Sequence, residues 1–579
     1  MASPECTTPP ALAPAGHLPR ARDERIGQSA ILLVALALVA VPMVPLVLQA
    51  FIDRPLYDWA GGFTLKNFRD LFTLPQIPAL AADTALFGLI SIGFSLGFGI
   101  LFSLLLGRTN VPGRGVLLNL LLWPIFISPL VIGFGAVLTY GPSGWVTGLA
   151  MSATGAAEPW NLYTVTGIGL ISGVAMVPLT ILYCISSALQ QDQRLEDAAR
   201  VAGAGPMRIL ARISVPLMRP AIVSAALMNV LAAVEMLAIP LLLGGPVNIQ
   251  LITTFIYDQG FENSRPNYGL VAAAALVLMA IVALLIWLQN RLVSRSHRFV
   301  SIGPKGGRKD TMNLGRWRWP AFGFVVFYLA LTIGALGMGL VARSFTLVLS
   351  PYVSPLDVLT LENYADIFLI DTYRRSILNT LLVAVIGAAV GTVLIASVAL
   401  VAQRSQYRLR RVADLVAQLP RAVPGLVVSM GVFYAIIFIP GLGLLNGTLI
   451  VLGLAYVIRH LPAGYGIVAP ALLQIAPDFD RAARVVGASW ATTARRIVLP
   501  MLKPALASCF ALLTILFLKE YAAAIFLYRP GNEVMSMTML YAWIPGHTGP
   551  VAALAVIQVI LTTLLLWLTT RIFGVKLHG

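Results

Sequence analysis

The sequence predicts an all-α polytopic membrane protein of about twelve transmembrane helices, arranged as two parallel six-helix repeats. Three observations support this fold class: a composition that is 58% hydrophobic and only 11% charged, a series of long apolar stretches, and a segment that recurs in both halves. An ordinary soluble domain has roughly 25% charged residues. Because a folded surface in water needs polar residues, the apolar excess must face lipid. The composition therefore excludes a water-soluble globular enzyme.

The apolar stretches predict the individual spans. The first runs from Ile26 to about Phe51 behind three arginines, an order of charge typical of a signal sequence. It is longer than the apolar part of a cleavable signal, so we expect a retained first helix. Further spans are expected near 80–107, 116–139, 164–190, 220–244, 268–290, 320–342, 377–402, 412–439, 448–473, 504–528 and 550–570.

The basic residues predict an orientation. Loops assigned to the cytoplasmic side carry 29 of the 40 Lys and Arg, and the opposite loops carry eight. Since basic loops tend to stay in the cytoplasm, both termini are expected there, and the +16 net charge reflects topology, not nucleic-acid binding. The expected division is a cytoplasmic tail (1–28), a first half (29–293), a cytoplasmic linker (294–319), a second half (320–573) and a C-terminal tail (574–579).

The sequence carries no signature of a metal site, a disulfide framework or a nucleotide-binding loop. Its three cysteines lie far apart, its five histidines lack metal-ligand spacing, and the glycine-rich stretch after Gly303 lacks the spacing of a phosphate-binding loop. A membrane-embedded enzyme would show His, Asp or Cys clustered at one depth. We therefore expect neither a cofactor in this chain nor ATP hydrolysis by it.

A segment near residue 200 recurs near residue 484. At an offset of 284, Ala198-Ala-Arg-Val-Ala-Gly203 aligns with Ala482-Ala-Arg-Val-Val-Gly487, and Pro216 aligns with Pro500. Identities at one fixed offset over about 27 positions indicate a duplication. Because each half has an even number of spans, the copies lie the same way up. Both segments should therefore face the cytoplasm, between the fourth and fifth spans of their halves.

The repeated segments have the pattern of docking helices. Residues 196–201 and 480–485 should be short helices, with an acidic residue early and a glycine just past the end, where a left-handed cap is easily formed. The small alanine pairs allow close approach, and Arg200 and Arg484 offer charged contacts. Two like helices on one face suit a two-fold symmetric partner. The alternative is a pair of surface helices that only turn the chain.

The pattern Glu/Asp-x-Ala-Ala-x-x-x-Gly, followed by Ile-x-x-Pro, resembles the EAA motif of permeases from binding-protein-dependent ABC importers. The resemblance implies a fused type I importer permease of the bacterial inner membrane, whose halves replace two subunits. It also implies a homodimeric cytoplasmic ABC ATPase that binds ATP and Mg²⁺, and a periplasmic substrate-binding protein. The implied ATPase-coupling residues are Glu196, Ala198, Ala199, Arg200, Gly203, Pro216, Asp480, Ala482, Ala483, Arg484, Gly487 and Pro500.

Ionisable residues inside spans are candidates for the pathway or its gate, because their burial in a membrane is costly. They are Glu235, Arg421, Arg459, Lys519 and Glu520. Glu235 and the Lys519-Glu520 pair occupy nearly matching positions in the two halves, which predicts a gate network or, alternatively, a structural ion pair. Arg421 lies between two prolines and either lines a cavity or reaches the cytoplasmic boundary.

Three segments (160–167, 241–246 and 251–257) resemble the fused permeases of the ferric-iron uptake group. This resemblance implies ferric iron as the substrate, with a phosphorylated organic anion or phosphonate, thiamine or a polyamine as alternatives. A secondary transporter is the rival class, because it too can be a doubled six-helix bundle. Such a transporter would not need matched docking helices in both halves.

Overall fold

The computed structural model describes residues 21–573, apart from 57, 59–60, 263–265, 297–311, 349–352 and 354–355. Most of the expected N-terminal tail, most of the expected linker and the expected C-terminal tail therefore lie outside the described residues. The described chain is almost entirely helical, and its β structure is limited to three isolated bridges. This confirms the predicted all-α class.

The first half contains α1 (Ala21–Ala50), α2 (Lys66–Thr73), α3 (Ile77–Arg108), α4 (Arg114–Leu122), α5 (Pro129–Tyr140), α6 (Trp145–Thr154), α7 (Val165–Leu189), α8 (Gln193–Val201), α9 (Pro206–Ile209), α10 (Val215–Leu217), α11 (Arg219–Glu235), α12 (Ala238–Gly244), α13 (Ile252–Tyr257) and α14 (Tyr268–Ser296). The second half contains α15 (Arg318–Leu329), α16 (Ala335–Ser344), α17 (Glu362–Leu369), α18 (Asp371–Leu382), α19 (Ala388–Arg404), α20 (Arg410–Gln418), α21 (Gly425–Phe438), α22 (Leu449–Gln474), α23 (Asp478–Val485), α24 (Trp490–Thr493), α25 (Leu499–Met501), α26 (Lys503–Leu518), α27 (Met535–Trp543) and α28 (Thr548–Phe573).

Nine helices in the described residues are long and apolar enough to cross a membrane, and the number rises to 13 if each of four bent helix pairs is one span. Eight of the twelve expected spans correspond to single helices of this kind. The other four expected spans are broken.

The expected spans 116–139 and 412–439 are not continuous helices. In the first, α4 gives way to a 3-10 turn over Trp123–Phe126, and α5 begins at Pro129. In the second, the helical segments on either side of Val423 meet at 109°. Proline cannot donate the helical hydrogen bond and clashes with the preceding turn, so Pro124 and Pro420 end one helix and Pro129 begins the next.

The helices in the expected spans 220–244 and 504–528 end earlier than the sequence analysis predicted. The helix α11 stops at Glu235, and Pro240 lies in the first turn of α12, where a missing N–H costs nothing. The helix α26 stops at Leu518, and the Glu520 carboxylate there accepts hydrogen bonds from the backbone N–H groups of Tyr521 and Ala523. These local bonds replace the helical ones and turn the chain.

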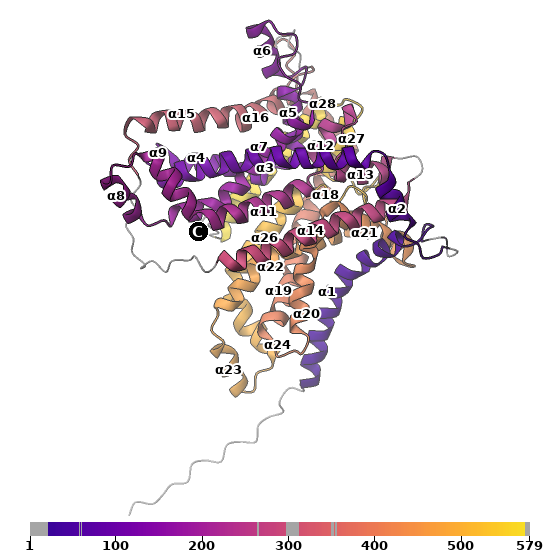
Figure 1. Ribbon diagram of the computed structural model, residues 1–579. Coiled ribbons are helices and arrows are strands. Elements are labelled where there is room, and N and C mark those ends of the chain that lie inside the picture. The colour runs from indigo at the N-terminus through magenta and orange to yellow at the C-terminus, as the bar shows by residue number, and fades with distance from the viewer. Residues whose placement is uncertain are drawn as a thin grey trace, which may run out of the picture.

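The halves exchange contacts through their first helices, which also pack on their own half. The N-terminal helix α1 packs on α19, α20 and α21 of the second half and on α14 of the first. In turn, α16 packs on α5 of the first half and on α28 of the second, and α15 packs on α4 of the first. In Figure 1 the helices α3, α7 and α11 run across the view and α19 and α22 run down it, while the tips α8 and α23 lie at the left and at the bottom. One buried cluster contains Phe134 and Tyr257 together with Val427 and Ile525, so a shared core joins the halves.

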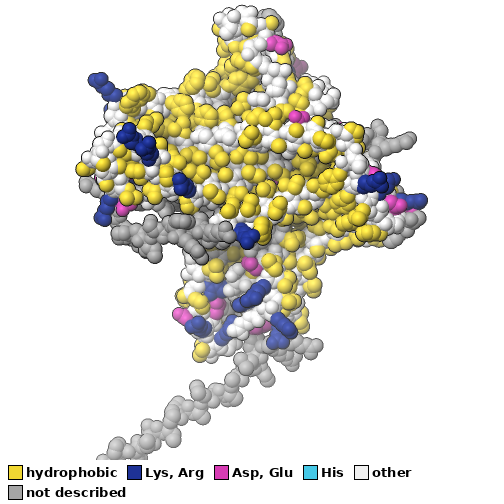
Figure 2. Space-filling model, in the orientation of Figure 1, with side chains coloured by type: hydrophobic (Ala, Val, Ile, Leu, Met, Phe, Trp, Pro, Cys, Tyr) yellow, Lys and Arg dark blue, Asp and Glu magenta, His cyan; other side chains and the backbone are white. Residues whose placement is uncertain are grey.

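The surface agrees with a membrane location. Figure 2 shows hydrophobic side chains over the middle of the visible face, while Lys and Arg gather toward its edges and the lower projection. A broad apolar surface of this kind needs a nonpolar environment.

Candidate functional site: two docking helices and a central charge cluster

The predicted short helices are present as α8 and α23, and we call them the docking helices after the role expected of them in the sequence analysis. Each ends in a glycine in the left-handed region, Gly203 with φ 82° and Gly487 with φ 79°. The backbone bonds match in both halves: the N–H of each glycine donates to the carbonyl of Arg200 or Arg484 (3.0 Å), and the next N–H donates to the second alanine of the pair (2.9 Å). This arrangement is a Schellman cap, and it confirms the predicted turn.

The docking helices expose matching apolar side chains that the sequence analysis did not select. Val201 is 91% exposed and Val485 87%, and Leu195 and Phe479 are also exposed. Both pairs are related by the same offset of 284 as the alanines. Of each alanine pair, Ala198 and Ala482 lie at the exposed surface, while Ala483 is buried and Ala199 packs on a buried cluster. Each docking helix therefore carries two exposed apolar side chains at matching positions.

Each docking helix is held by a buried arginine that the sequence analysis missed. Arg108, the last residue of α3, donates to Glu196 (2.8 Å) and to the carbonyls of Ala188 and Gln191. Arg404, the last residue of α19, donates to Asp480 (2.7 Å) and to two carbonyls at the end of α22. A repeat search at one offset could not find this pair, because the arginines are 296 residues apart and their acidic partners 284.

A bent connection leads from each docking helix into the membrane. It contains a π-helical turn, Leu210–Ser214 or Ala494–Val498, and a short helix that contains Pro216 or Pro500. The following helix, α11 or α26, then departs at 71° or 74°. The predicted prolines therefore lie at equivalent bends between docking helix and span.

The predicted in-span charges come together at the contact between halves, except for one. We call Glu235, Arg459, His460, Lys519 and Glu520 the central charge cluster. In it, Arg459 of α22 forms an ion pair with Glu235 at the end of α11 and donates to the carbonyl of Val423 at 3.1 Å. The side chains of Arg459 and Glu235 are 22% and 18% exposed. The ion pair thus bridges the two halves in a largely buried position.

The Lys519-Glu520 pair joins the same region through other partners. Glu520 contacts Nε2 of His460 at 2.6 Å, and Lys519 donates to the carbonyl of Ile125 in the first half. Glu235, Lys519 and Glu520 thus each have a different partner, namely Arg459, the carbonyl of Ile125 and His460. Three polar links cross between the halves here: Glu235 to Arg459, Lys519 to Ile125, and the N–H of Ala238 to the Tyr521 hydroxyl.

Arg421 does not belong to this cluster. It is exposed and donates to Gln289 of α14 at 3.0 Å. Gln289 lies two residues before Arg291, near the basic end of that helix. Arg421 also contacts the Met228 sulfur of α11, so both of its partners belong to the first half.

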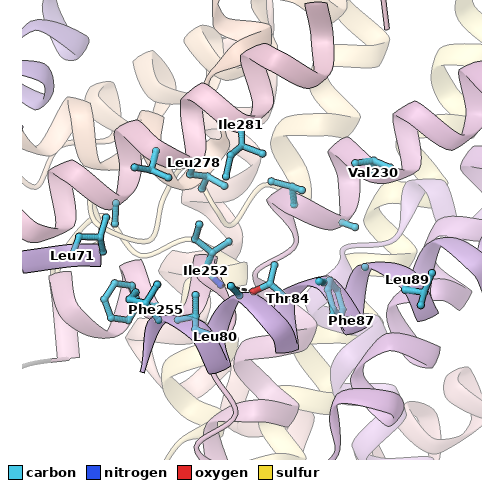
Figure 3. Close-up of a pocket in the computed structure, with 18 of the residues that line it drawn as sticks. Leu71, Leu80, Thr84, Phe87, Leu89, Val230, Ile252, Phe255, Leu278 and Ile281 are labelled. Carbon is cyan, nitrogen blue, oxygen red and sulfur yellow. Dashed lines mark hydrogen bonds between the residues drawn. The ribbon is translucent and has the colours of Figure 1, made fainter. Parts of the chain in front are cut away.

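An apolar hollow in the first half has different chemistry. It encloses about 550 Å³ between α2, α3, α11, α13 and α14, and its lining is almost entirely apolar. Figure 3 shows side chains such as Leu80, Phe87, Leu278 and Ile281 around it, and the Thr84 hydroxyl there accepts a hydrogen bond from the N–H of Ile252. Its lining has no charged side chain, so it offers nothing to bind an ion.

The chain thus has two matched docking helices, equivalent bent connections and a charged contact between duplicated helical halves. The chain belongs to the family described as binding-protein-dependent transport system inner membrane component, which it matches over residues 99–298 and 391–573. The protein is a fused, multi-pass inner membrane permease of an ABC importer. Family membership overturns the secondary-transporter reading.

The relatives found are also permeases. The chain is 27% identical to the putative ferric transport system permease protein FbpB 1 of Haemophilus influenzae over 77% of this chain and 69% of that protein. It is 25% identical to the ferric transport system permease protein FbpB of Actinobacillus pleuropneumoniae over 82% and 67%. It also matches the Escherichia coli sulfate transport system permease protein CysW with 27% identity over 46% and 88%.

Proposed function

We propose that this permease imports ferric iron, received from a periplasmic binding protein, with energy from ATP hydrolysed by a separate homodimeric ATPase. The observation that carries the proposal is the pair of matched docking helices in a chain whose ferric-permease relatives span both halves. Both termini and both docking helices then lie in the cytoplasm, in agreement with the basic loops. ATP and Mg²⁺ would be bound by the ATPase subunit and not by this chain.

The docking helices supply the mechanical input. Closure of the ATPase dimer would draw α8 and α23 together, and the bent connections would pass this movement to α11 and α26. Those helices end at Glu235 and Leu518, beside the central charge cluster. ATP acts as the ligand that shifts the balance between inward-open and outward-open states.

The central charge cluster would act as the gate. Its links cross between halves, so separation of the halves must break the Glu235–Arg459 pair and release Lys519 from Ile125. Glu235 and Glu520 balance Arg459 and Lys519 in formal charge. Such a gate resists opening until the docking helices move, but it does not select cations or anions by net charge.

The test is ATPase activity of the reconstituted permease and ATPase subunit, with and without a purified binding protein loaded with ferric iron. Stimulation by the iron-loaded form, and not by the empty form, is the expected result. A second arm loads the binding protein with putrescine, because 25% identity over 41% of this chain relates it to a spermidine/putrescine permease of Haemophilus influenzae. A third arm uses a sugar phosphate. Stimulation in either of these arms alone would reassign the substrate.

A further inference from the structure

The buried arginines at the ends of α3 and α19 make the same set of contacts in both halves. Each guanidinium binds an acidic residue in the first turn of its docking helix, Glu196 or Asp480, and two carbonyls at the end of the neighbouring span, from Ala188 and Gln191 or from Leu472 and Ile475. All six partners correspond at the offset of 284. One side chain thus joins three segments: its own helix, the next span and the docking helix.

The contacts need arginine in particular. Arg108 and Glu196 are 4% and 1% exposed, and Arg404 is 7% exposed. The planar guanidinium carries five donors in a fixed fork, so it can bind a carboxylate and two carbonyls together, whereas a lysine ammonium is a single compact charge. The carbonyls belong to helix ends, where they lack helical partners and attract a cation.

The same region is tied to the other half. The carbonyl of Arg108 accepts the N–H of Met312, in the segment that enters α15, at 2.8 Å. The carbonyl of Arg404 accepts the Trp490 indole N–H at 3.2 Å, and the backbone N–H of Trp490 donates to Glu24 of α1 at 2.7 Å. Each arginine therefore lies where its own docking segment meets the exchanged first helix of the opposite half.

We propose that Arg108 and Arg404 are positioning residues that clamp each docking helix rigidly to its helical bundle, so that movement of the ATPase is passed to the spans and not lost in the loop. This inference rests on the proposed docking role of α8 and α23. Without the clamp, the docking helix would remain helical and would still bind the ATPase, but its position relative to α19 and α22 would vary.

Spin labels test the clamp without substrate or ATPase. The labels are placed at Val485→Cys on α23 and Leu415→Cys on α20, which packs on α19 and α22, with Cys6→Ser, Cys184→Ala and Cys509→Ala in the full chain in nanodiscs. Arg404→Met with Asp480→Asn removes both charges and leaves no buried ion unpaired. Pulsed electron–electron double resonance measures the distances between the two labels. The distribution of these distances should be about twofold broader than in the parent chain, because the guanidinium that holds α23 is lost.

The matched control is Arg481→Met with Asp478→Asn, an exposed pair on the same helix. It should leave the distribution unchanged. Arg404→Lys keeps the charge and should broaden the distribution by an intermediate amount, which covers a failure of the double variant to fold. A distribution as narrow as that of the parent chain in both Arg404 variants would overturn the clamp.

A functional readout separates the clamp from the docking role. In the complex with the ATPase subunit, the Arg404→Met/Asp480→Asn variant should still hydrolyse ATP but lose stimulation by the iron-loaded binding protein. If the parent chain shows no stimulation, the proposed function fails while the label distances still decide the clamp. Normal stimulation in the double variant would show that the contact only supports folding.

Discussion

At the scale of single residues, Arg108 and Glu196 form the most deeply buried ion pair among the described residues. Arg108→Met leaves the Glu196 carboxylate buried and unpaired, so the free energy of unfolding should fall by about 3–5 kcal/mol. Arg481→Met, at an exposed pair, should change it by about 0–1 kcal/mol. Thermal unfolding in detergent measures both. Equal losses in the two variants would contradict the importance of burial.

The glycines after the docking helices are predicted to be needed for coupling. A Cβ at the left-handed position strains the turn by about 1 kcal/mol, although space for it is open. Gly203→Ala with Gly487→Ala should therefore reduce binding-protein stimulation of the ATPase. Gly205→Ala is the matched control, because Gly205 has equal open space but an ordinary φ of −71°. Full stimulation in the Gly203/Gly487 variant would rule out the need for glycine.

The ion pair between the halves predicts that weakening it allows ATP hydrolysis without the binding protein. Glu235→Gln weakens the attraction to Arg459 at the contact between halves, so ATPase activity without binding protein should rise several-fold. Asp371→Asn, at an exposed ion pair within α18, should leave that activity at the parent level. Lys519→Ala and Glu520→Ala test the remaining links by transport of iron from the loaded binding protein. Normal transport in both would assign these residues to structure alone.

At the scale of elements, the exposed apolar tips of the docking helices predict affinity for the ATPase subunit. Val201→Asp with Val485→Asp adds charge where an apolar contact is expected, and should weaken co-purification of the ATPase about tenfold or more. Leu444→Asp is a control at a site of equal exposure outside the docking helices. Unchanged co-purification of the ATPase with the tip variant would place the contact elsewhere.

Element boundaries were predictable where a local signal ends a helix. The caps at Gly203 and Gly487 follow from the sequence, and the breaks at Pro124 and Pro420 could have been placed by their prolines. The end of α26 could not, because the Glu520 carboxylate that turns the chain stands in an apolar run.

A second repeat was also missed: α2 and α17 match at an offset of 296, and Asn67 and Asn363 each donate to carbonyls at the end of the first helix of their half.

At the scale of the whole molecule, the exchange of first helices predicts that neither half is stable alone. A chain split within residues 297–311 and co-expressed should reassemble, because α1 packs on the second half and α15 and α16 on the first. Each half alone should be degraded or aggregate, because its part of the shared core would be uncovered. Co-purification of tagged halves measures reassembly. A stable, monodisperse single half would contradict the shared core.

The sequence by itself determined the membrane class, the duplication and the docking helices, because these depend on composition, on repeats and on caps within a few residues of each other. The partners of the buried charges were decided only by the tertiary structure. Arg108 is an ordinary basic residue at a helix end until Glu196 and the end of α7 are brought to it. Arg459 and Arg421 were both predicted as in-span charges, and only the fold shows that the first pairs with Glu235 and the second with Gln289. An ion pair depends on the distance between two charges in space. Local sequence patterns do not predict which charges will meet when the residues are 88 or 224 positions apart.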